Sequence, residues 1–241
     1  MIENTLINKF PAMGNLSASR ISTFTEYFSN APLWLLDNMT IVEIEKGSIF
    51  IKEGEVASNI YFLVTGVVEA IDLRVYGEPF YFKEFSDIQA FGGMETLLGE
   101  KKYFTTLQTA TKCMFLKMPK SIFERWINTD ISALMREAKL TIRNLLDEGR
   151  NNRLLLFTQG DKRLSLLLIK QYNSYNIGGT LIMNYNRQKI ADATGISVKT
   201  VSRVIKSFIE KGLVTKENNT LIINKQQCQD LEKSISNILD L

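Results

Sequence analysis

The sequence predicts an α+β protein with an N-terminal antiparallel β-roll or barrel, then one long helix, then a C-terminal domain of short helices and a hairpin. Between Thr40 and Lys117, short runs rich in Val, Ile, Phe, Tyr and Thr alternate with glycines, which is typical of strands joined by tight turns. From Ser121 to Leu156, apolar residues recur at steps of three, four and seven, the period of an amphipathic helix. Beyond Phe157 that repeat ends and several helix caps and turns follow. The expected parts are 1–120, 121–157 and 158–241.

The composition is that of a globular protein in an aqueous compartment, with 45% hydrophobic and 23% charged residues in a chain of 241. The longest apolar run, Leu164 to Ile169, is too short to span a bilayer and is interrupted by Ser165. The N-terminus MIENTLINKF lacks the basic start and apolar segment of a secretion signal. We therefore expect a cytoplasmic protein without a membrane partner.

The residue types exclude several kinds of chemistry. There is no histidine, which removes the commonest zinc and haem ligand and the commonest general base. Cys113 and Cys228 are the only cysteines, too few to hold an iron–sulfur cluster with four thiolates. No phosphate-binding GxxxxGK[ST] motif occurs. We expect no enzyme activity, no metal and no cofactor.

Charge is distributed unevenly along the chain. Residues 1–160 carry 17 Lys and Arg against 19 Asp and Glu, whereas residues 161–241 carry 12 against 7, a net charge of +5. A basic C-terminal third indicates a polyanion partner for that part of the protein.

The first part begins with helices and continues with strands. Residues 17–37 predict one or two short helices, with Phe24, Phe28, Leu33 and Leu36 facing a core. The turns between the strands are expected at glycines, namely Gly47, Gly54, Gly66, Gly77, Gly92 and Gly93.

One continuous helix is expected from Ser121 to Leu156. Its apolar stripe is Ile127, Ile131, Leu134, Ala138, Ile142, Leu145, Gly149 and Leu156. A stripe of this length favours a two-chain coiled-coil seam, and hence a homodimer. The alternative is a helix that lies along its own barrel.

The last part begins with a predicted capping box at 158–161, and 179–185 predicts a strand. Asn186 then caps a helix, Gly195 makes a turn, and Ser197 caps a second helix that Gly212 ends. A hairpin over 213–224 and a helix over 225–241 complete the chain. Two helices joined by a glycine turn and followed by a hairpin are a winged helix-turn-helix.

In such a unit the second helix has a buried face and a reading face. The core candidates are Ile190, Ala191, Ile196, Val201, Ile205 and Phe208. The candidates for contact with double-stranded DNA are Arg187, Val198, Lys199, Thr200, Ser202, Arg203 and Lys206. Arginine is the natural partner of guanine O6 and N7, so this face is expected to enter a major groove.

The segment RQKIADATGISVKTVSRVIKSFIEKGLV resembles the CRP/FNR family of bacterial transcription regulators. The barrel segments GSIFIKEGE and NIYFLVTGVVEA and the FGG turn at 91–93 extend the resemblance over the whole chain. The resemblance implies a dimeric DNA-binding regulator that contacts RNA polymerase. It places Arg203 at the family's guanine-reading arginine and Ser202 at the base-contacting serine of the FNR branch. Lys199 stands where the family often has Glu, so a different operator is expected.

The resemblance also places an effector pocket in the barrel. The corresponding residues are Gly92, Gly93, Met94, Glu95, Tyr103, Phe104 and Thr105. Relatives that bind cyclic nucleotides hold the phosphate with an arginine and a small hydroxyl, whereas this chain has Tyr103 and Phe104. A buried phosphate without a fixed cation is costly, so we expect an unknown small-molecule effector that is not a cyclic nucleotide. The alternative is that these side chains simply fill the barrel.

A second interpretation keeps the barrel as a ligand-binding module that signals through protein contacts without binding DNA. It predicts degraded recognition positions. Thr200, Ser202 and Arg203 all match the family pattern, which favours the DNA-binding regulator.

Overall fold

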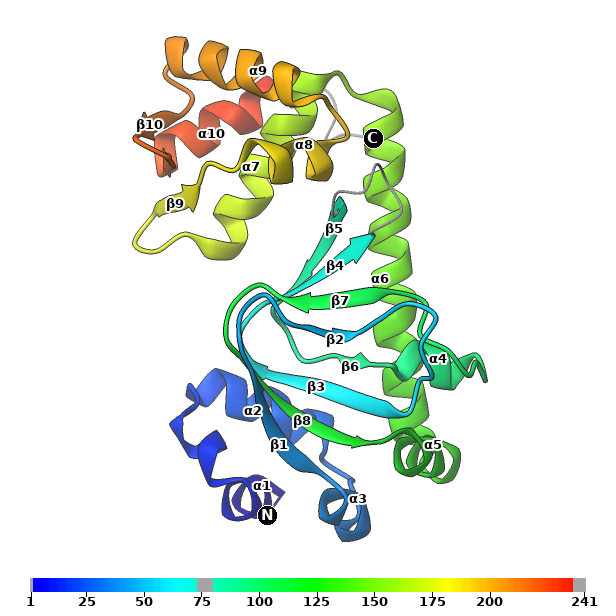
Figure 1. Ribbon diagram of the computed structural model, residues 1–241. Coiled ribbons are helices and arrows are strands. Elements are labelled where there is room, and N and C mark those ends of the chain that lie inside the picture. The colour runs from blue at the N-terminus through cyan, green and yellow to red at the C-terminus, as the bar shows by residue number, and fades with distance from the viewer. Residues whose placement is uncertain (1, 73–79, 236–241) are drawn as a thin grey trace. The chain divides into compact units, whose positions relative to one another are not determined.

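The computed structural model describes residues 2–72 and 80–235, and the chain divides into two compact units at Leu146 and Asp147 (Figure 1). The first unit is a roll of two antiparallel four-stranded sheets, ordered β1-β8-β3-β6 and β2-β7-β4-β5. The strands of the first sheet are β1 Thr40–Ile44, β8 Cys113–Pro119, β3 Asn59–Thr65 and β6 Ala90–Phe91. The strands of the second sheet are β2 Ile49–Ile51, β7 Thr106–Thr109, β4 Val68–Asp72 and β5 Phe80–Phe85. The α+β fold class and the β-roll predicted from the sequence are confirmed.

Aromatic and branched side chains fill the space inside the roll. Leu63, Val68 and Phe115 are fully buried there, and Phe91 and Leu107 nearly so. Phe50 packs its ring against Phe115, with ring centroids 4.7 Å apart. Glycines at the expected turns take positive φ angles, as at Gly47, Gly54, Gly66 and Gly92, and Gly77 lies outside the described residues.

Short helices cover the outside of the first sheet. They are α1 Ile2–Lys9, η1 Pro11–Asn15, α2 Ala18–Tyr27, α3 Leu33–Asp37 and α5 Lys120–Thr129. Phe24, Phe28 and Leu36 are fully buried in the core beneath them, as predicted. The prediction for Leu33 is wrong: it begins the single turn of α3 and is 67% exposed, while the adjacent Leu35 and Leu36 are buried.

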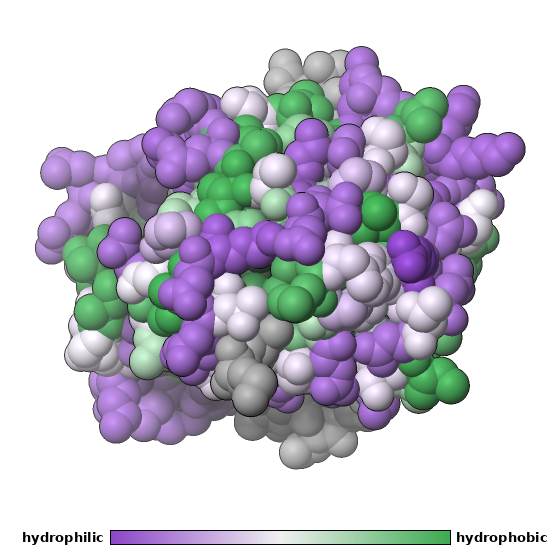
Figure 2. All heavy atoms as spheres, turned by 90° about the horizontal axis from the view of Figure 1, so that it is seen from below, coloured by the Kyte–Doolittle hydropathy of each residue, from purple (hydrophilic) through white to green (hydrophobic). Residues whose placement is uncertain are grey.

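The lower face of the molecule, in Figure 2, shows hydrophobic residues scattered among hydrophilic ones. A shallow hollow of about 470 Å³ lies where α3, α5 and the start of α6 Ile131–Phe157 meet, and Trp34, Trp126 and Ile131 help to line it.

The long helix of the sequence prediction is two helices. α5 ends at Thr129, and α6 Ile131–Phe157 begins after Asp130. Asp130 is extended, and its carboxylate accepts hydrogen bonds from the backbone N–H groups of Ser132 (2.9 Å) and Ala133 (3.2 Å). A capping aspartate thus starts a new helix inside an apolar repeat that continues on both sides of it.

The second unit contains the C-terminal elements. Its helices are α7 Gly160–Tyr175, α8 Arg187–Thr194, α9 Val198–Glu210 and α10 Lys225–Ser234. Its sheet is ordered β10-β11-β9, from β10 Thr215–Glu217, β11 Thr220–Asn224 and β9 Thr180–Asn184. The predicted hairpin over 213–224 is therefore confirmed. The predicted last helix over 225–241 is observed to Ser234, and residues 236–241 lie outside the described residues.

The capping box predicted at 158–161 is wrong. The N-cap of α7 is Gln159, and its side chain makes no capping hydrogen bond. Thr158 instead follows α6 directly and is buried, and its carbonyl accepts from Arg163 Nε at 2.8 Å. No helix in the described residues is long and apolar enough to cross a membrane.

Candidate nucleic-acid interface

The turn between α8 and α9 is fixed by a cap on each side. Asn186 caps α8 by accepting from Lys189 N at 3.1 Å, and Ser197 caps α9 by accepting from Thr200 N at 3.1 Å. Gly195 between them has φ +62°, a left-handed conformation that favours glycine. The caps at Asn186 and Ser197 and the turn at Gly195 are confirmed.

Arg163, which the sequence did not single out, supports this turn. Its Nη1 donates to the carbonyls of Thr194 (3.4 Å) and Gly195 (3.3 Å), and its Nε donates to Thr158 O. Free carbonyls at the end of a helix carry partial negative charge, so a guanidinium there is stabilising. This role could not be predicted from the sequence, because nothing there distinguishes Arg163 from the other basic residues or shows that it lies beside carbonyl groups at the end of α8.

α9 has one buried face and one polar face. Val201 is fully buried, and Val204, Ile205 and Phe208 are nearly so, in a core shared with α7 and α8. Ile190 and Ala191 of α8 are buried in the same core, and Ile196 is partly buried against it, as predicted. The opposite face exposes Lys199, Arg203 and Lys206. Burial of the apolar stripe therefore fixes which side chains α9 presents to solvent.

The remaining predicted contact residues lie on or beside this polar face. Arg187 is exposed at the start of α8, and Val198, Thr200 and Ser202 are half-buried in the first turns of α9. The Ser202 hydroxyl donates to Val198 O at 3.0 Å, and the hydroxyl oxygens of Thr200 and Ser197 lie 2.9 Å apart. Six of the seven residues therefore lie on α9, and Arg187 lies on the neighbouring helix α8.

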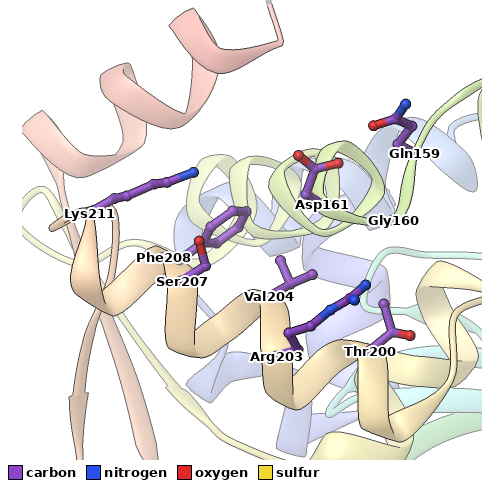
Figure 3. A pocket seen from close by; sticks show the side chains of 9 residues that line it. All are labelled: Gln159, Gly160, Asp161, Thr200, Arg203, Val204, Ser207, Phe208 and Lys211. Carbon is purple, nitrogen blue, oxygen red and sulfur yellow. The ribbon is translucent and has the colours of Figure 1, made fainter.

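A hollow of about 420 Å³ lies between α9 and the start of α7 (Figure 3). Arg203 and Lys211 bring two positive charges to its wall, and Asp161 brings a carboxylate. Thr200 and Ser207 add hydroxyl groups from α9. Lys211 was not among the predicted contact residues, because it follows Glu210, the last residue of α9, and so does not belong to the polar face of the helix. The wall of the hollow is therefore polar and carries two cationic side chains against one carboxylate.

The wing is the hairpin of β10 and β11. All of β10 is exposed, and Asn218 at the tip has φ +51°. Lys216 Nζ lies 4.9 Å from the centre of the Tyr185 ring, a cation–π contact that holds the wing's lysine beside the segment before α8.

The residues expected to bind an effector lie in the roll, and two of them, Tyr103 and Glu95, make hydrogen bonds to the backbone of the roll. Tyr103 is buried, and its hydroxyl donates to Asn59 O at 2.7 Å and accepts from Asn59 N at 3.2 Å. Burial raises the pKa of Tyr103 to about 12. Glu95 is also buried, and one carboxylate oxygen accepts from Phe104 N at 3.0 Å.

The turn beside these residues leaves little room for a larger side chain. Gly92 has φ +95°, and a Cβ there would lie 2.9 Å from Asn59 O and 3.3 Å from Tyr103 Cε1. Gly93 is buried, Met94 and Thr105 are half-buried, and Phe104 is 43% exposed. Lys101 and Lys102 are exposed. Among these described residues of the roll, the buried polar side chains are a carboxylate and a tyrosine, and the two lysines are exposed.

Comparison with known proteins matches both units. A family described as "Cyclic nucleotide-binding domain" matches residues 41–130, and one described as "Crp-like helix-turn-helix domain" matches residues 162–230. The "cAMP-activated global transcriptional regulator CRP" of Salmonella typhimurium is 22% identical over 193 residues, covering 79% of this chain and 92% of that protein. The "Transcriptional activator protein anr" of Pseudomonas aeruginosa is 22% identical over 189 residues, covering 75% of each. The structure of FixK2 from Bradyrhizobium japonicum superposes with a TM-score of 0.67 and 19% identity, over 80% of this chain and 96% of that one.

A sensor-type β-roll followed by a winged helix-turn-helix with a basic reading face defines a DNA-binding transcription regulator. The chain belongs to the CRP/FNR family of bacterial transcription regulators.

Proposed function

We propose that this regulator binds a palindromic operator as a homodimer and inserts α9 of each protomer into the major groove of one half-site. The observation that carries this proposal is the division of α9 between a buried apolar face and an exposed face with Lys199, Arg203 and Lys206. Arg203 is assigned to a guanine, because its fork of donors matches guanine O6 and N7. Arg187 and Lys206 are assigned to phosphates, which fix the position of the protein on the duplex.

The homodimer is supported by the two apolar faces of α6. Ala133 is buried in the core of the first unit, and Leu134 and Leu140 pack against that core. On the other side, Ile131 is 78% exposed and Ile142 and Leu145 are each 55% exposed. Met135 and Leu146 extend the exposed apolar stripe. An uncovered stripe at helical spacing is suited to a parallel partner helix, and twofold symmetry would produce a palindromic operator.

Control by a cyclic nucleotide is not part of this proposal. A nucleotide phosphate placed beside Tyr103 and Phe104 would find no buried cation among the residues that the structure describes, and it would meet the carboxylate of Glu95. We propose an uncharged or cationic effector, or none, and RNA polymerase as a protein partner in the cytoplasm. No catalytic role is proposed.

The first experiment measures DNA binding of the full-length protein at two salt concentrations. A mobility-shift assay with a pool of random duplexes should show binding that weakens steeply with salt, since phosphate contacts release counterions. Binding that is absent at both salt concentrations would contradict the proposal and favour a ligand-binding module that signals through protein contacts.

The second experiment measures mass by light scattering at micromolar concentration. The wild type should be a dimer, and Ile142→Glu should shift it towards a monomer because it places a charge in the exposed stripe. Arg143→Glu is the matched control, since Arg143 is exposed on α6 beside the stripe rather than in it. A monomeric wild type that binds DNA one-to-one would contradict the dimer.

A further inference from the structure

Arg163, on α7, joins two other segments of the second unit through backbone carbonyl groups. Its Nε donates to the carbonyl of Thr158, the residue that follows α6, at 2.8 Å. Its Nη1 donates to the carbonyls of Thr194 (3.4 Å) and Gly195 (3.3 Å), at the end of α8. One planar guanidinium group thus connects the start of α7 to the turn that precedes α9.

The start of α7 also packs directly against the first turn of α9. A Cβ at Gly160, the first residue of α7, would lie 3.3 Å from Ile196 Cγ2 and 3.5 Å from Thr200 Cγ2 (Figure 3). A Cβ at Gly195 would lie 3.4 Å from Arg163 Nη1. The backbones of α7, of the turn and of α9 therefore come together around this side chain.

The guanidinium group adds a directional restraint to the apolar core of the second unit. Val201, Ile205 and Phe208 hold α9 by burial, and hydrophobic burial has no preferred direction. A hydrogen bond weakens steeply when its length or angle departs from the optimum, and the arginine fork presents its donors in a fixed geometry. Contacts between α9 and base edges are hydrogen bonds too, so they require the same accuracy of placement.

The surroundings of Arg163 differ from those of the predicted DNA contacts. Lys199 and Arg203 are exposed on α9, whereas Arg163 is half-buried and donates to carbonyl groups of the protein itself. An effect of Arg163 on DNA binding would therefore act through the turn and the placement of α9.

We propose that Arg163 is a positioning residue for operator recognition: it holds the turn before α9, and so places the reading face, without contacting DNA. The inference rests on the proposed function, because it assumes that α9 reads the operator.

The experiment compares the affinities of full-length variants for two ligands, the duplex that the wild type selects from a random pool and the random pool itself. Arg163→Gln should lose about 5- to 160-fold in affinity for the selected operator, the value of one base contact. Its affinity for the random pool should stay within about 2-fold of the wild type, because the exposed basic side chains that contact phosphates are unchanged. Repeated selection with this variant should show a broader base preference.

Two further variants separate geometry from charge. Arg163→Lys keeps the positive charge but lacks the fork, so its operator affinity should lie between those of the wild type and Arg163→Gln. Lys162→Gln is the matched control, since Lys162 is the adjacent half-buried cation of α7. It should keep the wild-type ratio of operator affinity to random-pool affinity.

A stability measurement accompanies the binding assays. Circular dichroism should show that each variant is folded at the assay temperature. A role confined to stability would then leave both affinities unchanged, because a folded variant would bind as the wild type does. If Arg163→Gln does not fold, Arg163→Lys undergoes the same comparison, and its operator affinity should fall while its random-pool affinity does not.

The outcomes distinguish this inference from the proposed function. An equal loss on both ligands, with a slope of log K against log salt reduced by about 1, would assign Arg163 to a phosphate and overturn the inference. Unchanged affinities for a folded variant would show that the turn keeps its place without Arg163, which also overturns it. In both cases the protein remains a sequence-specific regulator. A wild type that selects no sequence would overturn the proposed function and this inference together.

Discussion

The hydroxyl group of Tyr27, on α2, donates a hydrogen bond to the carboxyl group of Glu137, on α6, inside the core of the first unit. Burial raises the pKa of Glu137 to about 7, although the Tyr27 hydrogen bond and the charge of Arg136 act in the opposite direction. Burial and the neighbouring Glu137 raise the pKa of Tyr27. The Arg136 guanidinium lies 5.5 Å from the centre of the Tyr27 ring. Gly93, the first residue of α4 Gly93–Leu97, packs against Glu137 and brings no charge.

The stability of the first unit should depend on pH through Glu137. Between its ordinary pKa of 4.5 and its folded pKa of about 7, the folded protein holds a proton that the unfolded chain has lost. The free energy of unfolding should therefore fall as pH rises through this range, by roughly 3 kcal/mol in total, and change little above it. Glu137→Gln should remove most of this slope, because an amide remains neutral.

Urea unfolding at several pH values tests this prediction. Both tryptophans, Trp34 and Trp126, lie in the first unit, so their fluorescence follows that unit alone. Glu124→Gln, at an exposed position of α5, is the control and should keep the wild-type slope. Identical pH profiles for the wild type and Glu137→Gln would show that another group titrates.

Arg203→Ala should weaken binding to the preferred operator by roughly 1–3 kcal/mol and relax the choice at one guanine. Operator selection and titration with labelled duplexes measure both effects. An Arg203 variant that retains the full base preference would place the reading face of α9 in another register.

Arg187→Ala should weaken binding to all sequences alike and flatten the salt dependence, because each lost phosphate contact lowers the slope of log K against log salt by about 1. Titrations over a range of salt concentrations give this slope. An unchanged slope with altered base preference would assign Arg187 to a base edge instead.

Arg163→Lys should lower the free energy of unfolding of the second unit by about 1–3 kcal/mol. A lysine keeps the positive charge but lacks the planar guanidinium group, which donates to three carbonyl groups at once. The thermal transition of the helices, followed by circular dichroism, measures the change. Lys162→Arg is the control, as Lys162 is the adjacent basic residue of α7. Equal midpoints for Arg163→Lys and the wild type would mean that the bonds to Thr158, Thr194 and Gly195 contribute little.

Calorimetry with cyclic AMP and cyclic GMP should show no binding at micromolar concentration, because Tyr103 and Glu95 occupy the site with their own hydrogen bonds. The same titrations should leave operator affinity unchanged. Micromolar binding of either nucleotide with a rise in operator affinity would show that the roll opens and supplies a cation from elsewhere.

The sequence by itself determined the helix-turn-helix of α8 and α9 in the second unit. Asn186, Ser197 and Gly195 act through backbone groups within four residues of themselves, so their roles can be read locally. The buried face of α9 follows from the spacing of its apolar residues. They form a single stripe along the helix, and that stripe must face the core.

Only the tertiary structure decided features that depend on distant partners. The apolar period of 121–156 continues through Asp130, so periodicity could not show where a capping carboxylate divides it. Leu33 resembles its neighbours in sequence, and only the packing of α3 determines which leucines are covered. The proximity of Tyr27 to Glu137, and of Arg163 to the end of α8, joins residues far apart in the chain. Such contacts set the burial and charge of a group, and these are properties of the packed core that no local pattern encodes.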